Sequence, residues 1–226
     1  MKFPLQAIPR EYARWPLLAL LLAVSLWLGS RAGGEGRLHN TAVAPEGVVS
    51  LERAADPLEA RKIISFWDRW EGRKFAIETI EIDFIFLIFY STTLALACVI
   101  AADRLFLIGK AKLRSLSNSE REAHEFNGWI RLGNLGILLA WGQWVAAALD
   151  AAENEAILTM LRNAPTQLNT TISWICADLK FGLIAGAIIY ASLGVLTYFG
   201  LTFFKPQLVR SPDQDAAEAQ AKLAFE

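Results

Sequence analysis

Uncharged apolar runs alternate with charged segments along this chain of 226 residues. Residues 84–102, 132–149 and 181–204 contain no Lys, Arg, Asp or Glu. A helix rises about 1.5 Å per residue, so about 20 apolar residues cross a hydrocarbon core about 30 Å thick. We therefore expect a transmembrane helix in each of these three runs.

A shorter uncharged run covers residues 15–30 and allows two interpretations. Basic residues precede it as they precede a secretion signal, and Ser30-Arg31-Ala32 fits a small-x-small cleavage site. The run could instead be a retained anchor whose flanking arginines reach the interface. We expect retention, which gives four spans. Cleavage would leave the orientation of the other three spans unchanged.

Basic residues predict the orientation, because short loops rich in Lys and Arg stay in the cytoplasm. Residues 103–131 hold six basic residues, whereas residues 150–180 hold two. The predicted organisation is a cytoplasmic N-terminal segment at 1–14, spans at 15–30, 84–102, 132–149 and 181–204, extracytoplasmic loops at 31–83 and 150–180, a cytoplasmic loop at 103–131 and a cytoplasmic tail at 205–226.

The first outer loop contains a predicted helix. Asp56-Pro57 suits a helix start, with Asp56 as the N-cap and Pro57 in the first turn. Trp67 and Trp70 then continue an amphipathic stripe, and Gly72 is expected to end it. The two tryptophans could anchor the helix in the membrane interface, or the helix could pack on the bundle. The predicted fold is an all-α, four-helix transmembrane bundle with a small extracytoplasmic helical cap.

The composition adds exclusions. Hydrophobic residues make up 54% of the chain and the net charge is −1, so no basic field indicates a nucleic-acid partner. Cys98 and Cys176 fall near opposite membrane faces, and we expect both to be small buried residues that cannot pair. His39 and His124 also fall on opposite sides, so they cannot ligate one metal ion or haem together. No metal, cofactor or catalytic motif is evident, and we expect no enzymatic activity.

The predicted membrane interior contains no charged side chain. Intramembrane charges usually mark ion pathways, so their absence argues against a secondary transporter or proton pump. Gln143 is the polar residue best able to bridge helices there, as structural glue or as a ligand contact. Gly182 and Gly186 form a GxxxG pair that suits close helix packing in the bundle, or a dedicated oligomer interface.

Acidic residues gather at the predicted outer rim of the bundle. The candidates are Glu78, Glu81, Asp83, Asp150 and Asp178, and Glu153 accompanies them. They could form a carboxylate site for a divalent cation or a cationic ligand. Acidic residues also favour helix N-termini without any ligand. Asp83 lies about 200° round a helix from Glu81, so the two share a site only if other helices surround Asp83.

Three segments carry a resemblance. They are Gly47-Val48-Val49-Ser50-Leu51-Glu52, Ala60-Arg61-Lys62-Ile63-Ile64-Ser65-Phe66-Trp67 and Asp83-Phe84-Ile85-Phe86-Leu87-Ile88-Phe89-Tyr90-Ser91. Together they resemble a pattern in uncharacterised bacterial four-span integral membrane proteins. The resemblance implies a multi-pass protein of the bacterial inner (plasma) membrane, with both termini cytoplasmic, and it implies no activity.

Two functions from different classes follow from these observations. The first is a non-catalytic accessory or scaffolding subunit whose partners are the lipid bilayer and other membrane proteins. The alternative is binding or transport of a small molecule or ion through the outer carboxylate site. A membrane enzyme acting on lipid or quinone would need a catalytic group that the sequence does not offer.

Overall fold

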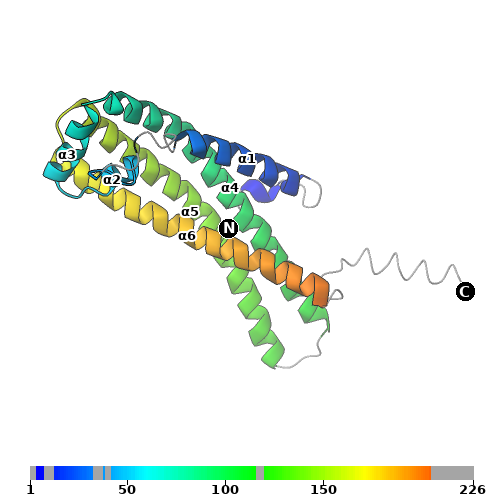
Figure 1. The fold of residues 1–226 in the computed structure, drawn as a ribbon. Helices are drawn as coiled ribbons and strands as arrows, with labels where there is room; N and C mark the ends of the chain where they lie inside the picture. The colour runs from blue at the N-terminus through cyan, green and yellow to red at the C-terminus, as the bar shows by residue number, and fades with distance from the viewer. Residues whose placement is uncertain (1–3, 8–12, 33–37, 39–41, 116–119, 205–226) are drawn as a thin grey trace, which may run out of the picture.

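The computed structural model describes residues 4–7, 13–32, 38, 42–115 and 120–204. The elements are a short 3-10 helix and six α-helices: η1 (Pro4–Ala7), α1 (Arg14–Ala32), α2 (Val48–Glu52), α3 (Pro57–Trp67), α4 (Gly72–Ser115), α5 (Glu120–Arg162) and α6 (Gln167–Phe204) (Figure 1). No strand occurs in these ranges, which confirms the all-α class. The predicted tail at 205–226, most of the segment at 1–14, and His39 lie outside the described residues.

Figure 1 shows α1, α4, α5 and α6 running side by side. The helices α4, α5 and α6 all contact one another, and α1 packs chiefly on α4. Each predicted span lies inside a longer helix, because α4 continues well past residue 102 and α5 continues past residue 149. The segment at 150–180, predicted as an outer loop, is therefore mostly helical, with a short break between α5 and α6.

Three helices of the described chain are long and apolar enough to cross a membrane: Gly72–Lys110, Gly128–Arg162 and Gln167–Thr197. The helix α1 is not among them, so the prediction of four spans is met for three. The physical reason is that α1 has a short apolar stretch, with Arg14 and Arg31 near its two ends. Its outward side is nevertheless apolar, since Leu20, Leu26 and Trp27 are exposed.

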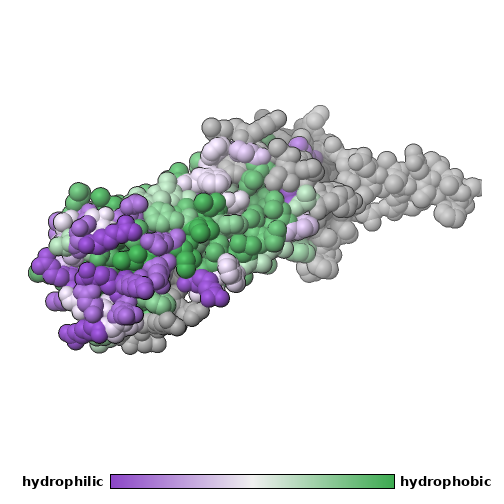
Figure 2. All heavy atoms as spheres, turned by 90° about the horizontal axis from the view of Figure 1, so that it is seen from above, coloured by the Kyte–Doolittle hydropathy of each residue, from purple (hydrophilic) through white to green (hydrophobic). Residues whose placement is uncertain are grey.

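Polar groups mark two levels along the bundle. Asp83 and Asp103 both lie on α4, 20 positions apart, which is about 30 Å along a helix. Asp103 is buried and pairs with the buried Arg14 of α1. Figure 2 shows hydrophobic residues in the middle of the molecule and hydrophilic residues gathered at the end that carries α2 and α3. The distance between the two levels matches the thickness of a hydrocarbon core.

The helices α2 and α3 pack on the ends of α4, α5 and α6. Asp56 is the N-cap of α3, and its carboxylate accepts a 2.8 Å hydrogen bond from the Leu58 backbone N–H, with Pro57 in the first turn. This confirms the predicted helix start. The helix α3 ends at Trp67, before the end predicted at Gly72. The chain then turns at Glu71, whose φ of 60° is left-handed, and Gly72 is instead the first residue of α4.

Trp67 is not a lipid-facing anchor. Its side chain is fully buried, and it belongs to a core with Leu51, Ile63, Ile157 and other residues of α2 to α5. The prediction that Trp67 sits in the membrane interface is therefore wrong, because the stripe on α3 covers the ends of α4 and α5 instead. Trp70 is partly exposed, and its role as an anchor stays a prediction.

Close helix contact occurs at other glycines than the GxxxG pair. A Cβ at Gly194 would lie 2.6 Å from the Cβ of Ala101, so α6 and α4 approach closely there. A Cβ at Gly182 would meet nothing within 4 Å, and one at Gly186 would lie 3.7 Å from Leu139. Cys98 is also buried at the α4–α6 contact, and both cysteines are free, as predicted.

Gly194→Ala should destabilise the protein, because the new methyl group overlaps Ala101. The expected loss is about 1–3 kcal/mol, as for other overpacked cores. Gly182→Ala is the matched control on the same helix, and it should be neutral or slightly stabilising because Ala favours helices. Thermal unfolding in mild detergent, followed by tryptophan fluorescence, measures both. Equal unfolding temperatures for the two variants would contradict the close α4–α6 contact.

Candidate functional site

A buried lysine lies at the centre of a polar cluster. The Nζ of Lys180 on α6 donates to Asp150 Oδ1 at 2.6 Å and to Glu153 Oε1 at 2.9 Å, both on α5. Glu52 at the end of α2 completes the set, with its Oε2 at 4.0 Å from Nζ. All four side chains are buried. The cluster therefore joins three helices through one ammonium group.

Two further contacts extend the cluster to α4. The Tyr90 hydroxyl donates to Asp150 Oδ2 at 2.9 Å, so both carboxylate oxygens of Asp150 are used. Asp83 accepts a 2.7 Å hydrogen bond from the Asn154 amide, and it lies within electrostatic reach of Asp150 and Lys180. A buried ammonium is tolerated only when charged partners and hydrogen bonds satisfy it, and here both are present.

The structure divides the predicted acidic rim into two groups. Asp83 and Asp150 lie in the cluster, together with Glu153. Glu78, Glu81 and Asp178 are exposed, and Glu81 forms an open ion pair with Arg162 at 3.5 Å. They do not belong to the site, because they lie on the outward sides of α4 and α6. The expected separation of Glu81 from Asp83 around the helix is the reason.

Sequence reasoning missed Lys180 and Glu52 as site residues. The sequence analysis uses Lys180 only as one of the two basic residues in the loop at 150–180. It uses Glu52 only as the last residue of the segment 47–52, which contributes to the resemblance. One signal was available: Lys180 is the last charged residue before the uncharged run of α6, so it lies at the same level as Asp150. No comparable signal exists for Glu52, because its position depends on how α2 folds back onto α6.

Specific contacts place Glu52. Its backbone carbonyl accepts a 3.3 Å hydrogen bond from the buried Ser173 hydroxyl of α6. Its side chain is 11% exposed, and its Oε2 has no hydrogen-bond partner. Burial raises the pKa of Glu52 above its ordinary value, and the charge of Asp150 raises this pKa further, whereas Lys180, Glu153 and Arg53 act in the opposite direction. The net shift is upward, so Glu52 keeps its proton to a higher pH than a free glutamate does.

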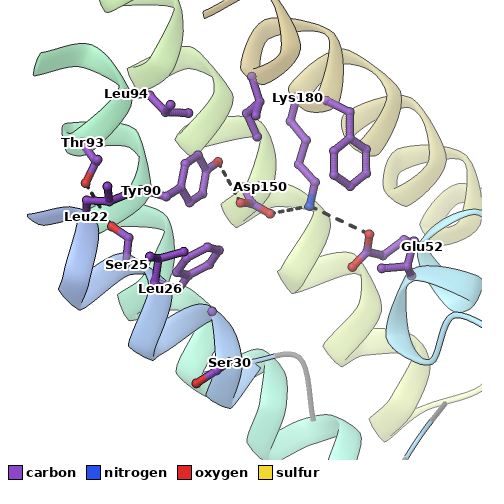
Figure 3. Close-up of a pocket in the computed structure, with 15 residues that line it drawn as sticks. Leu22, Ser25, Leu26, Ser30, Glu52, Tyr90, Thr93, Leu94, Asp150 and Lys180 are labelled. Atoms are coloured by element: carbon purple, nitrogen blue, oxygen red, sulfur yellow. Dashed lines mark hydrogen bonds and ion pairs between the residues drawn. The ribbon is translucent and has the colours of Figure 1, made fainter. Parts of the chain in front are cut away.

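A pocket of about 570 Å³ lies next to the cluster (Figure 3). Residues of α1, α4 and α6 supply its apolar walls, among them Leu22, Leu26, Phe86, Leu94 and Ile184. Glu52, Tyr90, Asp150 and Lys180 line one end of it. Farther along, the Ser25 and Thr93 hydroxyls are 3.0 Å apart and join α1 to α4. The pocket is thus apolar along its length and charged at one end.

Gln143 lies outside this pocket and acts between two helices. It is fully buried, and its amide nitrogen donates to the carbonyls of Leu139 on α5 and Leu183 on α6, at 3.3 and 3.2 Å. Gln143 does not line the pocket. These contacts support the structural interpretation of this residue over the ligand contact.

A divalent cation does not fit the cluster. In the described ranges, no three His, Cys, Asp or Glu side chains are placed to hold one metal ion. Lys180 occupies the position between the carboxylates where a cation would bind. The side chains of this cluster can instead form hydrogen bonds or an ion pair with an organic ligand in the pocket.

Comparison of the chain with protein-family models gives no match. No curated protein and no solved structure matches it either. The resemblance to four-span bacterial proteins therefore stays a prediction, and the function must be argued from the geometry.

Lys180→Met should destabilise the protein strongly, because it leaves buried carboxylates without their cation. Breaking a buried ion pair by removing one partner costs about 3–5 kcal/mol. Adding Glu153→Gln to this variant should recover part of the loss, and Lys74→Met, at an exposed lysine, is the control. Unfolding in detergent gives all four stabilities, and equal effects of Lys180→Met and Lys74→Met would contradict the cluster.

The raised pKa of Glu52 predicts how stability depends on pH. The contribution of Glu52 to the free energy of unfolding is fully present below the ordinary pKa of a glutamate in the unfolded chain. It is lost as the pH rises through the raised pKa of Glu52 in the folded protein. Glu52→Gln removes this titration, so its stability should fall less than that of the wild type as the pH rises. Glu46→Gln, at an exposed glutamate of the same segment, should follow the wild type. Parallel curves for the wild type and Glu52→Gln would refute the prediction.

Proposed function

We propose that this protein is a multi-pass membrane protein that binds an amphiphilic small molecule in the pocket between α1, α4 and α6. The single observation that carries the proposal is the pocket itself, which is apolar along α1 and ends at the cluster of Glu52, Asp150 and Lys180. Its volume of about 570 Å³ falls within the usual range for small-molecule sites.

The direction of the pocket supports an amphiphile. Its lining on α1 runs from Leu22 to Ser30, which is about 12 Å along the helix. Its charged end lies at the boundary of the uncharged runs, where lipid head groups are expected. An apolar body would lie along the helices, and a polar head would meet the cluster.

The helix α1 is the fourth span in this proposal. Arg14 pairs with Asp103, and Ser25 bonds to Thr93, so polar contacts hold α1 against α4 at two depths. Such contacts favour a retained helix over a cleaved signal. With the basic segment at 103–131 in the cytoplasm, both termini lie there, α2 and α3 form an extracytoplasmic cap, and the bacterial inner membrane is the expected location.

The accessory or scaffolding function needs no pocket. Exposed apolar side chains on α5 and α6, such as Leu138, Ile189 and Leu196, are what lipid contact requires, so they do not indicate a protein partner. The outer-face ligand site is therefore the better supported of the two hypotheses. It differs from the predicted rim in its residues, because the charged end of the pocket replaces the exposed glutamates.

The test is to fill the pocket with a larger side chain. Ile184→Trp places an indole on the lining of the pocket, whereas Ile189→Trp makes the same change on the exposed side of α6. A diazirine-labelled fatty alcohol in phosphatidylcholine nanodiscs should label peptides of α1 and α4 in the wild type. Ile184→Trp should lower this labelling about tenfold, equivalent to about 1.4 kcal/mol of binding. Ile189→Trp should leave it unchanged, and equal labelling in all three proteins would disprove the pocket.

A further inference from the structure

The free oxygen of Glu52 indicates which head group the pocket accepts. Three of the four polar side chains that line the charged end form hydrogen bonds with one another: Asp150 accepts one from the Tyr90 hydroxyl and one from Lys180 Nζ. Glu52 Oε2 is the exception, since it is buried, lies 4.0 Å from Lys180 Nζ and accepts no hydrogen bond. Figure 3 shows the Glu52 carboxyl group at this end of the pocket, with Lys180 between it and Tyr90.

A buried acceptor without a partner is costly. Leaving such a group unsatisfied costs about 1–3 kcal/mol, and more when the group is charged. The fold relieves this cost only in part: Lys180 Nζ lies 4.0 Å from Oε2 and Glu153 also acts on the Glu52 carboxyl group, whereas Ser173 bonds the backbone carbonyl of Glu52. A ligand that donates a hydrogen bond to Oε2 would relieve it.

The charges around Glu52 favour a cation as the donor. Four carboxyl groups surround the ammonium group of Lys180, those of Glu52, Asp83, Asp150 and Glu153. Arg53 forms an exposed ion pair with Glu46 at 3.3 Å, and it lowers the pKa of Glu52 less than Lys180 and Glu153 do. A second positive charge near Glu52 would therefore meet carboxyl groups that can ionise to pair with it, whereas an anionic head group would oppose their ionisation.

We propose that the pocket binds a lipophilic amine, whose ammonium group donates to Glu52 Oε2 while its apolar body lies between α1, α4 and α6. This inference rests on the proposed function and names the ligand class of the same site. Burial raises the pKa of Glu52, and pairing with an ammonium ion lowers it again. The ammonium ion enters already protonated, and any proton that the Glu52 carboxyl group holds leaves to the buffer as the two groups pair.

The experiment compares decylamine with decanol, which has the same chain and a neutral head group. Full-length protein in phosphatidylcholine nanodiscs is titrated by calorimetry in two buffers of different ionisation enthalpy, with empty nanodiscs subtracted. The wild type should bind decylamine about tenfold more tightly than decanol and should release protons with the amine only.

Glu52→Gln should lose both the preference for decylamine and the proton release, so it should bind the two ligands about equally. Measurable decanol binding also shows that this variant is folded. Glu46→Gln removes a nearby exposed carboxylate and should behave as the wild type.

Competition with lysophosphatidylethanolamine then identifies the source of the amine. Displacement of decylamine by this lipid supports an amine-bearing lipid, and resistance to it supports a free lipophilic amine. Equal binding of decylamine and decanol by the wild type, or an amine preference that survives in Glu52→Gln, overturns the amine proposal and leaves the pocket standing. Failure of both ligands to bind the wild type overturns the pocket as well.

Discussion

The burial of Lys180 is the constraint on which the arrangement of the helices depends. An ammonium group in a low-dielectric setting must have carboxylates close by, or it loses its charge. Lys180 meets this need with Asp150 and Glu153, which fixes the rotation of α6 against α5. Asp150 in turn holds Tyr90 of α4, and Glu52 brings α2 to the same place. One charged group thus orients four helices at one end of the bundle.

A second polar contact acts at the other end and explains why the pocket exists. Arg14 pairs with Asp103, and Ser25 bonds to Thr93, so α1 is held to α4 by polar groups along one face. Close packing of α4 on α6 occurs elsewhere, at Gly194 and Ala101. Because α1 packs chiefly on α4, the space between α1 and α6 is left to the pocket.

The features that the sequence predicts well are those that depend on neighbours along one helix. Uncharged runs locate the long helices, Asp56 and Pro57 locate the start of α3, and helical geometry separates Asp83 from Glu81. Features that depend on tertiary placement were missed or wrong. Trp67 is buried because α3 folds onto α4 and α5, and Glu52 joins Lys180 only because α2 contacts α6. Spacing along the chain contains no record of either contact.

Three buried side-chain oxygens of the described residues have no hydrogen-bond partner, and one of them, Glu153 Oε2, forms an ion pair with Lys180 at 2.9 Å. The other two, on Gln143 and Glu52, differ in what surrounds them. The Gln143 amide donates twice, to carbonyls of α5 and α6, and these bonds offset the cost of its free oxygen. Glu52 Oε2 has the distant ion pair with Lys180, at 4.0 Å, and it lies at the wall of a pocket that a ligand can enter. An unsatisfied group inside packed protein costs stability permanently, whereas one at a pocket costs stability only while the pocket is empty. That difference is the physical reason to regard Glu52 as a binding residue and Gln143 as a structural one.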